Sequence, residues 1–485
     1  MSWDGWNLVR KVRRRAFGFV LLLPVVWVIG ERRASAQSAD KAKVKTFTLQ
    51  EAVDFALKNY PAVRASLEQA NAARSGVDLA RTDYLPRTDM LWQGNRASRN
   101  NILGLLLPQS VIPAVSGPVF PTTSGQGVWG SAAALLFSWE PIDFGARRAR
   151  LDSAKAAQSQ ANSQLALTRL DVAVATINSF LTLVAAEQTV HAAQADVDRR
   201  EVFDKSVHVL VENQLRAGAD ASRADAELAR ARANLARAFQ LQETSSAALA
   251  NILGIADARV EVREGALAQK PTENVPNTPT LSTHPLAEAQ QARVQEFRSG
   301  VRLLDRSYYP KFDLQSAVYG RGSGANTDGT FQGGSNGLGI DRSNWAVGLT
   351  VTFPLFDIFS IRARKGIEFA NEQAEAARYD QTIQDLTGQL KKAQASLEGA
   401  RKVAEATPVE LQAARATETQ ETARYQAGLA TLVDVSDAQS LLVQAEIDDA
   451  LAQLAVWQNL AAVAASQGDL SPFLQFLHDK TQGRP

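Results

Sequence analysis

Apolar side chains follow alternating steps of three and four along residues 383–404. The seven positions are Ile383, Leu386, Leu390, Ala393, Leu397, Ala400 and Ala404. Such steps place the apolar side chains on one seam of an α-helix, and this heptad pattern requires a second helix to cover the seam. A shorter copy of the pattern occurs at Leu228, Ala231, Leu235 and Ala238. The chain is therefore predicted to contain long helices that pair as coiled coils.

The predicted helices are too long for a compact domain. A helical pattern extends from Asp143 to Gly218, which corresponds to a rod of roughly 110 Å if it is unbroken. A second helix is expected to return over 220–253, and the stretch 48–84 is expected to form an entering helix of similar length. Helices of globular domains average about 11–12 residues, so a compact domain does not accommodate such a rod. The returning and entering helices are each about half as long as the rod, so two of them placed end to end can match one long helix.

Alternation of apolar residues with small or polar ones marks a second kind of element. The clearest case has apolar residues at Trp345, Val347, Leu349, Val351 and Phe353. The two unlike faces extend over about nine residues, the length of a tilted membrane-spanning strand. A less regular partner, with Ser131 on its apolar face, extends from Trp129 to Trp139. Alternation by itself fits a strand of a soluble sandwich equally well.

The layout of the chain occurs twice. The spacing from Pro61 to Pro86 equals that from Pro285 to Pro310. Each copy reads as helix, strand, loop, strand, long helix, tip and returning helix, and the Pro-bearing joint between the copies has one strand-like segment at 259–263. After a signal peptide at 1–36, we therefore predict a first repeat at 37–254, a linker at 255–283, a second repeat at 284–468 and a C-terminal tail at 469–485.

The number of strands favours the membrane interpretation. Only four segments have the character of membrane-spanning strands, and they flank two long irregular loops at 99–127 and 322–343. Four strands cannot close a barrel. Because lipid leaves no place for an open sheet edge, several chains would have to pool their strands.

Residues 1–36 have the features of a secretory signal peptide. A basic segment at 10–15 precedes an apolar segment at 16–30, and small residues lead up to a cleavage site after Ala36. A membrane anchor is the alternative. However, about fifteen apolar residues interrupted by Pro24 fall short of the roughly 20 that span a bilayer.

Composition excludes several classes of function. The chain of 485 residues has no cysteine, which rules out a disulfide framework, a thiolate metal site and a cysteine nucleophile. Its 52 Lys and Arg balance 51 Asp and Glu, and several of the basic residues lie in the signal segment. The remainder is therefore acidic, and nucleic acid is not expected as a partner.

No arrangement for catalysis or cofactor binding stands out. The histidines lack an H-x-x-x-H spacing, so solvated or capping roles are expected rather than metal ligation; they are His191, His208, His284 and His478. The Gly-rich segment 320–339 lacks the G-K-[ST] of a phosphate-binding loop and is predicted to be a flexible external loop. We expect no enzyme activity, no cofactor and no metal.

Together, the doubled layout, the heptad seams, the four strands and the Gly-bearing tips resemble the TolC-like outer-membrane efflux channels. The resemblance covers residues 45–470, and the doubled layout is its specific part. It implies a mainly α-helical fold with a β-barrel contribution, in which a homotrimer pools four transmembrane strands per chain into a twelve-stranded barrel above a coiled-coil tunnel. It also implies a passive conduit for efflux or type I secretion, with outer-membrane lipid, a periplasmic adaptor (membrane fusion) protein and an inner-membrane pump as partners.

The same resemblance assigns roles to the two tips. In the family, each periplasmic tip carries a Gly followed by small or hydroxyl-bearing residues that meet the adaptor. The matching residues are Gly218 and Ser222 in the first half and Gly428, Leu429, Ala430 and Thr431 in the second half.

The resemblance also implies a gate. In the family, a ring of Asp residues that follows the second tip constricts the tunnel mouth. A Tyr just ahead of the tip Gly holds this ring in place. Here the matching residues are Asp434 and Asp437, at i and i+3 on one helical face, and Tyr425. The chain departs from the family at Ala430, where a basic residue is frequent, and at Ala224, where an acid is expected. The alternative role of the two Asp residues is to favour the dipole at a helix N-terminus.

Two competing classes of function stay open. A soluble periplasmic coiled-coil adaptor or scaffold would place the strands in a small soluble domain, and its presence in a detergent-free periplasmic extract would favour this class. An enzyme with helical arms would need a pocket of converging titratable groups, and the sequence does not reveal one.

Overall fold

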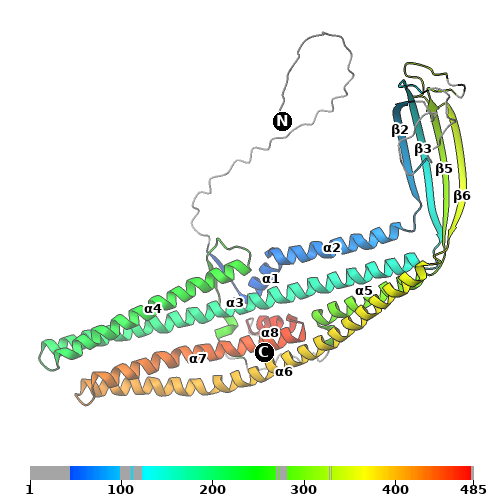
Figure 1. Ribbon diagram of the computed structural model, residues 1–485. Helices are drawn as coiled ribbons and strands as arrows, with labels where there is room; N and C mark the ends of the chain where they lie inside the picture. Colours follow the sequence, from blue (N-terminus) through cyan, green and yellow to red (C-terminus); the bar gives the residue numbers. More distant parts are fainter. Residues whose placement is uncertain are drawn as a thin grey trace, which may run out of the picture. The chain divides into compact units, whose positions relative to one another are not determined.

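The computed structural model describes residues 44–98, 111–112, 123–268, 271, 281–326, 328 and 330–481 (Figure 1). The signal peptide lies outside these residues and stays a prediction. In the first half the main elements are α1 (Leu49–Asn59), α2 (Pro61–Thr82), β2 (Arg87–Ser98), β3 (Gly127–Ile142), α3 (Ala146–Glu212) and α4 (Gly218–Ile252). In the second half they are α5 (Pro285–Arg306), β5 (Lys311–Ser323), β6 (Arg342–Thr352), α6 (Asp357–Gln426) and α7 (Leu432–Gln467).

The long helices form as predicted. Helix α3 has 67 residues and α6 has 70, each about 100 Å long at the usual rise. Helix α4 returns along α3 and α7 returns along α6, so each half ends in a helical hairpin (Figure 1). On the predicted seam of α6, Leu386, Leu397 and Ala404 are buried. On α4, Leu228 and Ala231 pack against Val197 of α3.

The entering helix differs from the expectation of one continuous helix over 48–84. It is divided into α1 and α2 at Tyr60, whose backbone is extended (φ −66°, ψ 127°). Pro61 follows as the first residue of α2, a position where its missing N–H leaves no intrahelical bond unmade. The capping box of Thr48 and Glu51 begins α1 and satisfies two backbone N–H groups.

Short elements surround the middle of the long helices. They are β1 (Lys45–Phe47), β4 (Val260–Val262), the 3₁₀-helices η1 (Gly265–Ala268) and η2 (Leu281–Thr283), and α8 (Ser471–Thr481). Strand β4 lies within the predicted strand-like segment and pairs in parallel with β1. The main hydrophobic core is here, and its largest buried side chains include Phe180, Trp457 and Phe473. The Phe473 ring of α8 lies 6.4 Å from the Trp457 ring of α7.

By length and composition, α3 is the single described helix that could cross a membrane. Half of the most apolar 18-residue stretch of α3, however, is buried inside the protein. Ile177, Phe180 and Leu181 belong to the hydrophobic core around α1, α7 and α8. The apolar character of α3 is therefore explained by the core.

The four longer strands form one antiparallel sheet in the order β2-β3-β5-β6. Met90, Leu135, Val318 and Trp345 are directly opposite one another across all four strands, and their exposed fractions are 85%, 49%, 61% and 78%. Directly opposed residues share a face of the sheet. One face is thus apolar and exposed.

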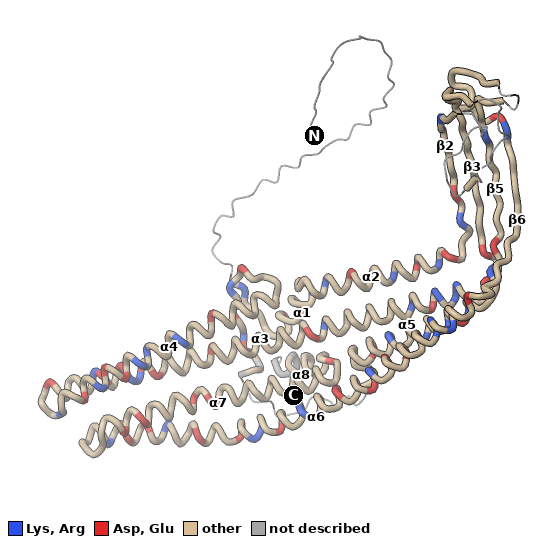
Figure 2. Tube along the Cα trace, viewed as in Figure 1, with Lys and Arg blue, Asp and Glu red and all other residues tan. Residues whose placement is uncertain are grey.

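The other face of the sheet carries polar residues. Gln93, Ala132, Arg321 and Arg342 form the corresponding row on that face. After Arg342, β6 has no charged residue (Figure 2). The predicted two-faced strands are therefore confirmed. By chain connectivity, the sheet and the hairpin tips lie at opposite ends of the long helices (Figure 1).

Candidate functional site at the two helical hairpin tips

The tip of the second hairpin is built around Gly428. This residue adopts a left-handed backbone conformation (φ +79°). The N–H of Leu429 donates to the carbonyl oxygen of Arg424 at 2.8 Å, and the N–H of Gly428 donates to that of Tyr425 at 3.0 Å. These two bonds form a Schellman motif, which ends α6 and requires a residue that tolerates positive φ.

The next residues begin α7 and use one of the predicted gate carboxylates. Thr431 and Asp434 form a capping box, in which the backbone N–H of Thr431 donates to Asp434 Oδ2 at 2.8 Å. This hydrogen bond lowers the pKa of Asp434 below its ordinary value. Asp434 therefore belongs to the N-terminal cap of α7. Asp437 is also exposed, and it has no ion pair or hydrogen bond among the described residues.

The tip of the first hairpin is more open. Residues 213–217 connect α3 to α4, and Gln214 has positive φ (58°). Gly218 starts α4 with an ordinary helical backbone, and a Cβ added there would meet nothing within 4 Å. Ser222 is exposed one turn later. These two predicted tip residues therefore face free space in this chain.

The two tips are joined through Tyr425. Its side chain is 1% exposed and packs with Val207, Ala224 and Val435 in a small hydrophobic cluster between the hairpins. The ring of Phe203 on α3 lies 5.2 Å away. Burial and the nearby Asp220 carboxylate raise the pKa of Tyr425. Its hydroxyl oxygen is buried and has no hydrogen-bond partner among the described residues.

Arg216 completes this junction and was missed by the sequence reasoning. Its Nη2 donates to the backbone carbonyl oxygen of Tyr425 at 2.7 Å, and its guanidinium lies 4.3 Å from the centre of the Tyr425 ring. A charged donor and a cation–π contact act on the same residue. The only hint in the sequence is an Arg placed just before the first tip Gly, which does not reveal its partner in the other half.

A second junction between the two hairpins lies farther from the tips. Arg200 on α3 is almost fully buried and forms ion pairs with Asp196 at 3.0 Å and with Glu227 of α4 at 3.3 Å. It also donates to Ser440 of α7 at 3.0 Å. Removing one partner of such a buried network leaves an uncompensated charge. The network therefore links α3 both to α4 of its own hairpin and to α7 of the other hairpin.

Two residues have surroundings that the resemblance did not predict. Ala430 is only 9% exposed and belongs to the cluster around Tyr425, whereas its neighbour Leu429 is 71% exposed. Ala224, at the position where an acid was expected, is buried in the same cluster. A basic side chain at position 430 or a carboxylate at position 224 would lose its hydration in this cluster. The small side chains are thus explained by packing between the tips.

The histidines were expected to be solvated or to cap helices. His284 does cap α5, where its Nδ1 accepts from the N–H of Leu286 at 3.1 Å. Burial lowers its pKa. The side chain of His478 lies outside the described residues. His208 instead has two carboxylates as neighbours, Asp204 and Asp225.

Comparison with known proteins agrees with this architecture. The model of the family described as "Outer membrane efflux protein" matches residues 52–255 and 280–469. The protein CyaE of Bordetella pertussis is 27% identical over 437 residues, which is 88% of this chain and 85% of CyaE.

Two solved structures show the same fold. The open state of the MtrE outer membrane channel of Neisseria gonorrhoeae has a TM-score of 0.71 at 19% identity and covers 87% of this chain and 89% of its own. The CmeC outer membrane channel of Campylobacter jejuni has a TM-score of 0.68 at 16% identity and covers 90% of each chain. With the family match over more than half of the sequence, the chain belongs to the outer membrane efflux protein family: it is a TolC-like outer-membrane channel of the tripartite efflux and secretion class, a transport conduit and not an enzyme.

Proposed function

We propose that three copies of this chain pool their strands into a twelve-stranded barrel in the outer membrane. Among the described strands, β2 and β6 each have a neighbour on one side only. An unpaired strand edge carries backbone groups that lipid cannot satisfy. Pairing β2 of one copy with β6 of the next closes the sheet, places the apolar row of Met90 and Trp345 against lipid, and turns the polar face inward.

The two-faced sheet with open edges is the observation that carries this proposal. Apolar residues just after β6 support the same proposal, because Leu355, Phe356 and Phe359 are 72%, 86% and 75% exposed. Patches of this kind mark surfaces that contact lipid or another protein. In the trimer, the helices of three copies would enclose the periplasmic tunnel.

We further propose that the two tips contact a periplasmic adaptor, which connects the channel to an inner-membrane pump. The pump selects the cargo, and the channel conducts it passively by efflux or type I secretion. Gly218, Ser222 and Leu429 are exposed and fit this contact. Ala430 contributes through packing, and Gly428 through the shape of the turn.

Gly218→Trp is expected to block adaptor docking and to reduce efflux by the complete system to near the level without the channel. Added bulk at a small contact surface prevents close approach, and Gly218 has free space and no positive φ, so the hairpin should still fold. Gly428→Trp is a poorer test, because its φ of +79° would strain any other residue. Efflux assays and co-purification of the adaptor measure the effect.

The matched control is Gly76→Trp on α2, where a Cβ also meets nothing within 4 Å. This control should leave efflux unchanged. Normal docking and efflux by the Gly218→Trp channel would place the adaptor contact elsewhere.

We propose that Asp434 and Asp437 give the tunnel mouth a negative charge. The cap hydrogen bond keeps Asp434 ionised, and Asp437 is exposed on the same helix face. In a planar bilayer the channel should be cation-selective and blocked by a trivalent cation from the periplasmic side. Asp437→Asn should weaken both properties, with the difference shrinking at high salt because charges are screened within about 3 Å at 1 M. Unchanged selectivity and block would remove Asp437 from the gate.

The structure also separates this charge from the contact that joins the tips. Arg216 binds the backbone and the ring face of Tyr425, and the Tyr425 hydroxyl has no partner among the described residues. In the same bilayer experiment, Arg216→Met should therefore raise conductance more than Tyr425→Phe. A larger effect of Tyr425→Phe would instead assign the closed state to the hydroxyl.

A further inference from the structure

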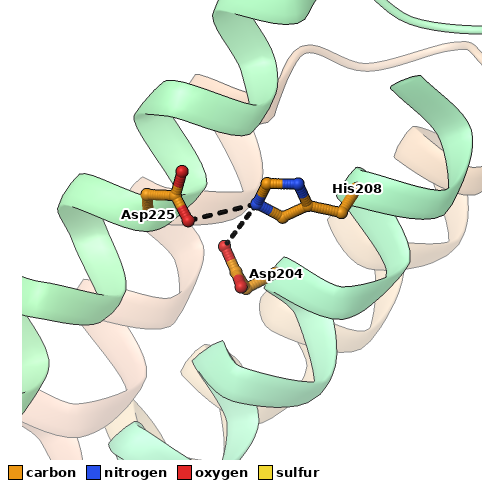
Figure 3. A group of neighbouring side chains, drawn as sticks. All are labelled: Asp204, His208 and Asp225. Atoms are coloured by element: carbon orange, nitrogen blue, oxygen red, sulfur yellow. Dashed lines mark hydrogen bonds and ion pairs between the residues drawn. The ribbon is translucent and has the colours of Figure 1, made fainter. Parts of the chain in front are cut away.

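Three potential metal ligands converge on the first hairpin, roughly one to three helical turns from its tip. Asp204 and His208 are one turn apart on α3, and Asp225 faces them from α4 (Figure 3). Asp225 Oδ1 lies 3.1 Å from Nε2 of His208, and Asp204 Oδ1 lies 3.8 Å from the same nitrogen. The three candidate ligand atoms lie within 4.8 Å of one another. Both carboxylates thus point at one imidazole nitrogen.

These separations are close to those of a coordination shell. Zinc–nitrogen and zinc–oxygen bonds of about 2.0–2.2 Å place tetrahedral ligand atoms roughly 3.4 Å apart. The two His208 contacts bracket that value, so small side-chain adjustments would bring the three atoms around an ion. Two of the ligands come from α3 and the third from α4, so the arrangement exists only in the folded hairpin.

A second observation concerns Asp204. Its side chain is 14% exposed, and its Oδ1 atom is buried without a hydrogen-bond partner among the described residues. Buried carboxylate oxygens are normally satisfied, because an unpaired charged oxygen has lost its hydration. This oxygen is the one directed toward His208 (Figure 3). It would be satisfied by a cation held between the three side chains.

We propose that Asp204, His208 and Asp225 bind a divalent transition-metal ion that ties α3 to α4 above the first tip. One imidazole nitrogen with two carboxylate oxygens suits Zn²⁺ and related ions, whereas Mg²⁺ and Ca²⁺ prefer oxygen ligands alone. Three protein ligands leave one position for water. The Asp225 side chain is 61% exposed and that of His208 is 41% exposed, so an ion can reach the site from solvent.

The ion would act on the junction between the tips. Val207 precedes His208 and Ala224 precedes Asp225, and both of these apolar residues pack in the cluster around Tyr425. Fixing α3 to α4 therefore fixes two walls of that cluster.

The test uses the full-length protein in detergent, purified without a histidine tag, stripped with a chelator and titrated with Zn²⁺ alone. We expect one Zn²⁺ per chain, and an increase in the melting temperature as the ion saturates the folded state. Co²⁺ in place of Zn²⁺ should give a visible spectrum typical of nitrogen and oxygen ligands. His208→Gln and Asp225→Asn should each weaken Zn²⁺ binding by at least about tenfold. Even the loss of a residue that only hydrogen-bonds to a metal ligand typically lowers metal affinity by about 10–100-fold.

His191→Gln is the matched control, because His191 lies on the same helix outside the cluster. It should leave Zn²⁺ affinity and the rise in melting temperature unchanged. Failure of the stripped protein to bind Zn²⁺ would overturn the proposal and leave the cluster as a hydrogen-bonded contact between α3 and α4. Binding that His208→Gln does not weaken, or that His191→Gln weakens equally, would also overturn it. None of these outcomes depends on transport, so they are independent of the proposed channel function.

Discussion

Val347→Lys is expected to abolish assembly of the channel in the outer membrane. Val347 lies at the middle of β6 on the apolar face, with 65% of its side chain exposed. A Lys at the bilayer midplane of a barrel costs about 2–4 kcal/mol per strand, so three copies would lose roughly 6–12 kcal/mol. That loss is comparable to the whole stability of many folded proteins. Membrane fractionation and the yield of heat-resistant oligomer measure the effect.

Thr350→Lys is the matched control for this change. Thr350 lies on the same strand but on the polar face, directly opposite Asp313 of β5. A Lys there would gain an opposite charge as its neighbour across the strands. Assembly should be close to wild type. Equal loss of oligomer with both variants would contradict the assignment of the two faces.

Local patterns were sufficient to predict the main elements of the fold. The heptad positions Leu386, Leu397 and Ala404 are buried as expected. Apolar residues spaced alternately three and four apart form one seam, which a partner helix must cover. The alternation from Trp345 to Val351 also matches the exposed face of β6. In both cases the information lies within one element of the chain.

Elements that depend on distant partners were harder to predict. Strand β1, which was not predicted, has three residues and exists through its pairing with the predicted strand β4 across more than 200 positions. Helix α8 falls in the segment predicted as a tail, and it is held by Phe473 packing near Trp457. Neither segment has a pattern long enough to be distinctive by itself.

The same distinction applies to the tips. The turn at Gly428 could be placed from sequence, because Gly is favoured just after a helix, where the backbone adopts a left-handed conformation. The contact from Arg216 to Tyr425 joins residues from opposite halves of the chain, and the cluster of His208 with Asp225 joins two helices. A single sequence does not reveal which side chains such distant elements bring together.

Native mass spectrometry of the detergent-solubilised protein tests the central claim most directly. The account predicts one species of three chains, since four strands per chain leave β2 and β6 with open edges that other copies must cover. Because the chain has no cysteine, a variant with one Cys on β2 and one on β6 should also form disulfide-linked trimers on oxidation, whereas either Cys alone should not. A stable monomer that keeps its sheet, without linkage between β2 and β6, would contradict the pooled barrel.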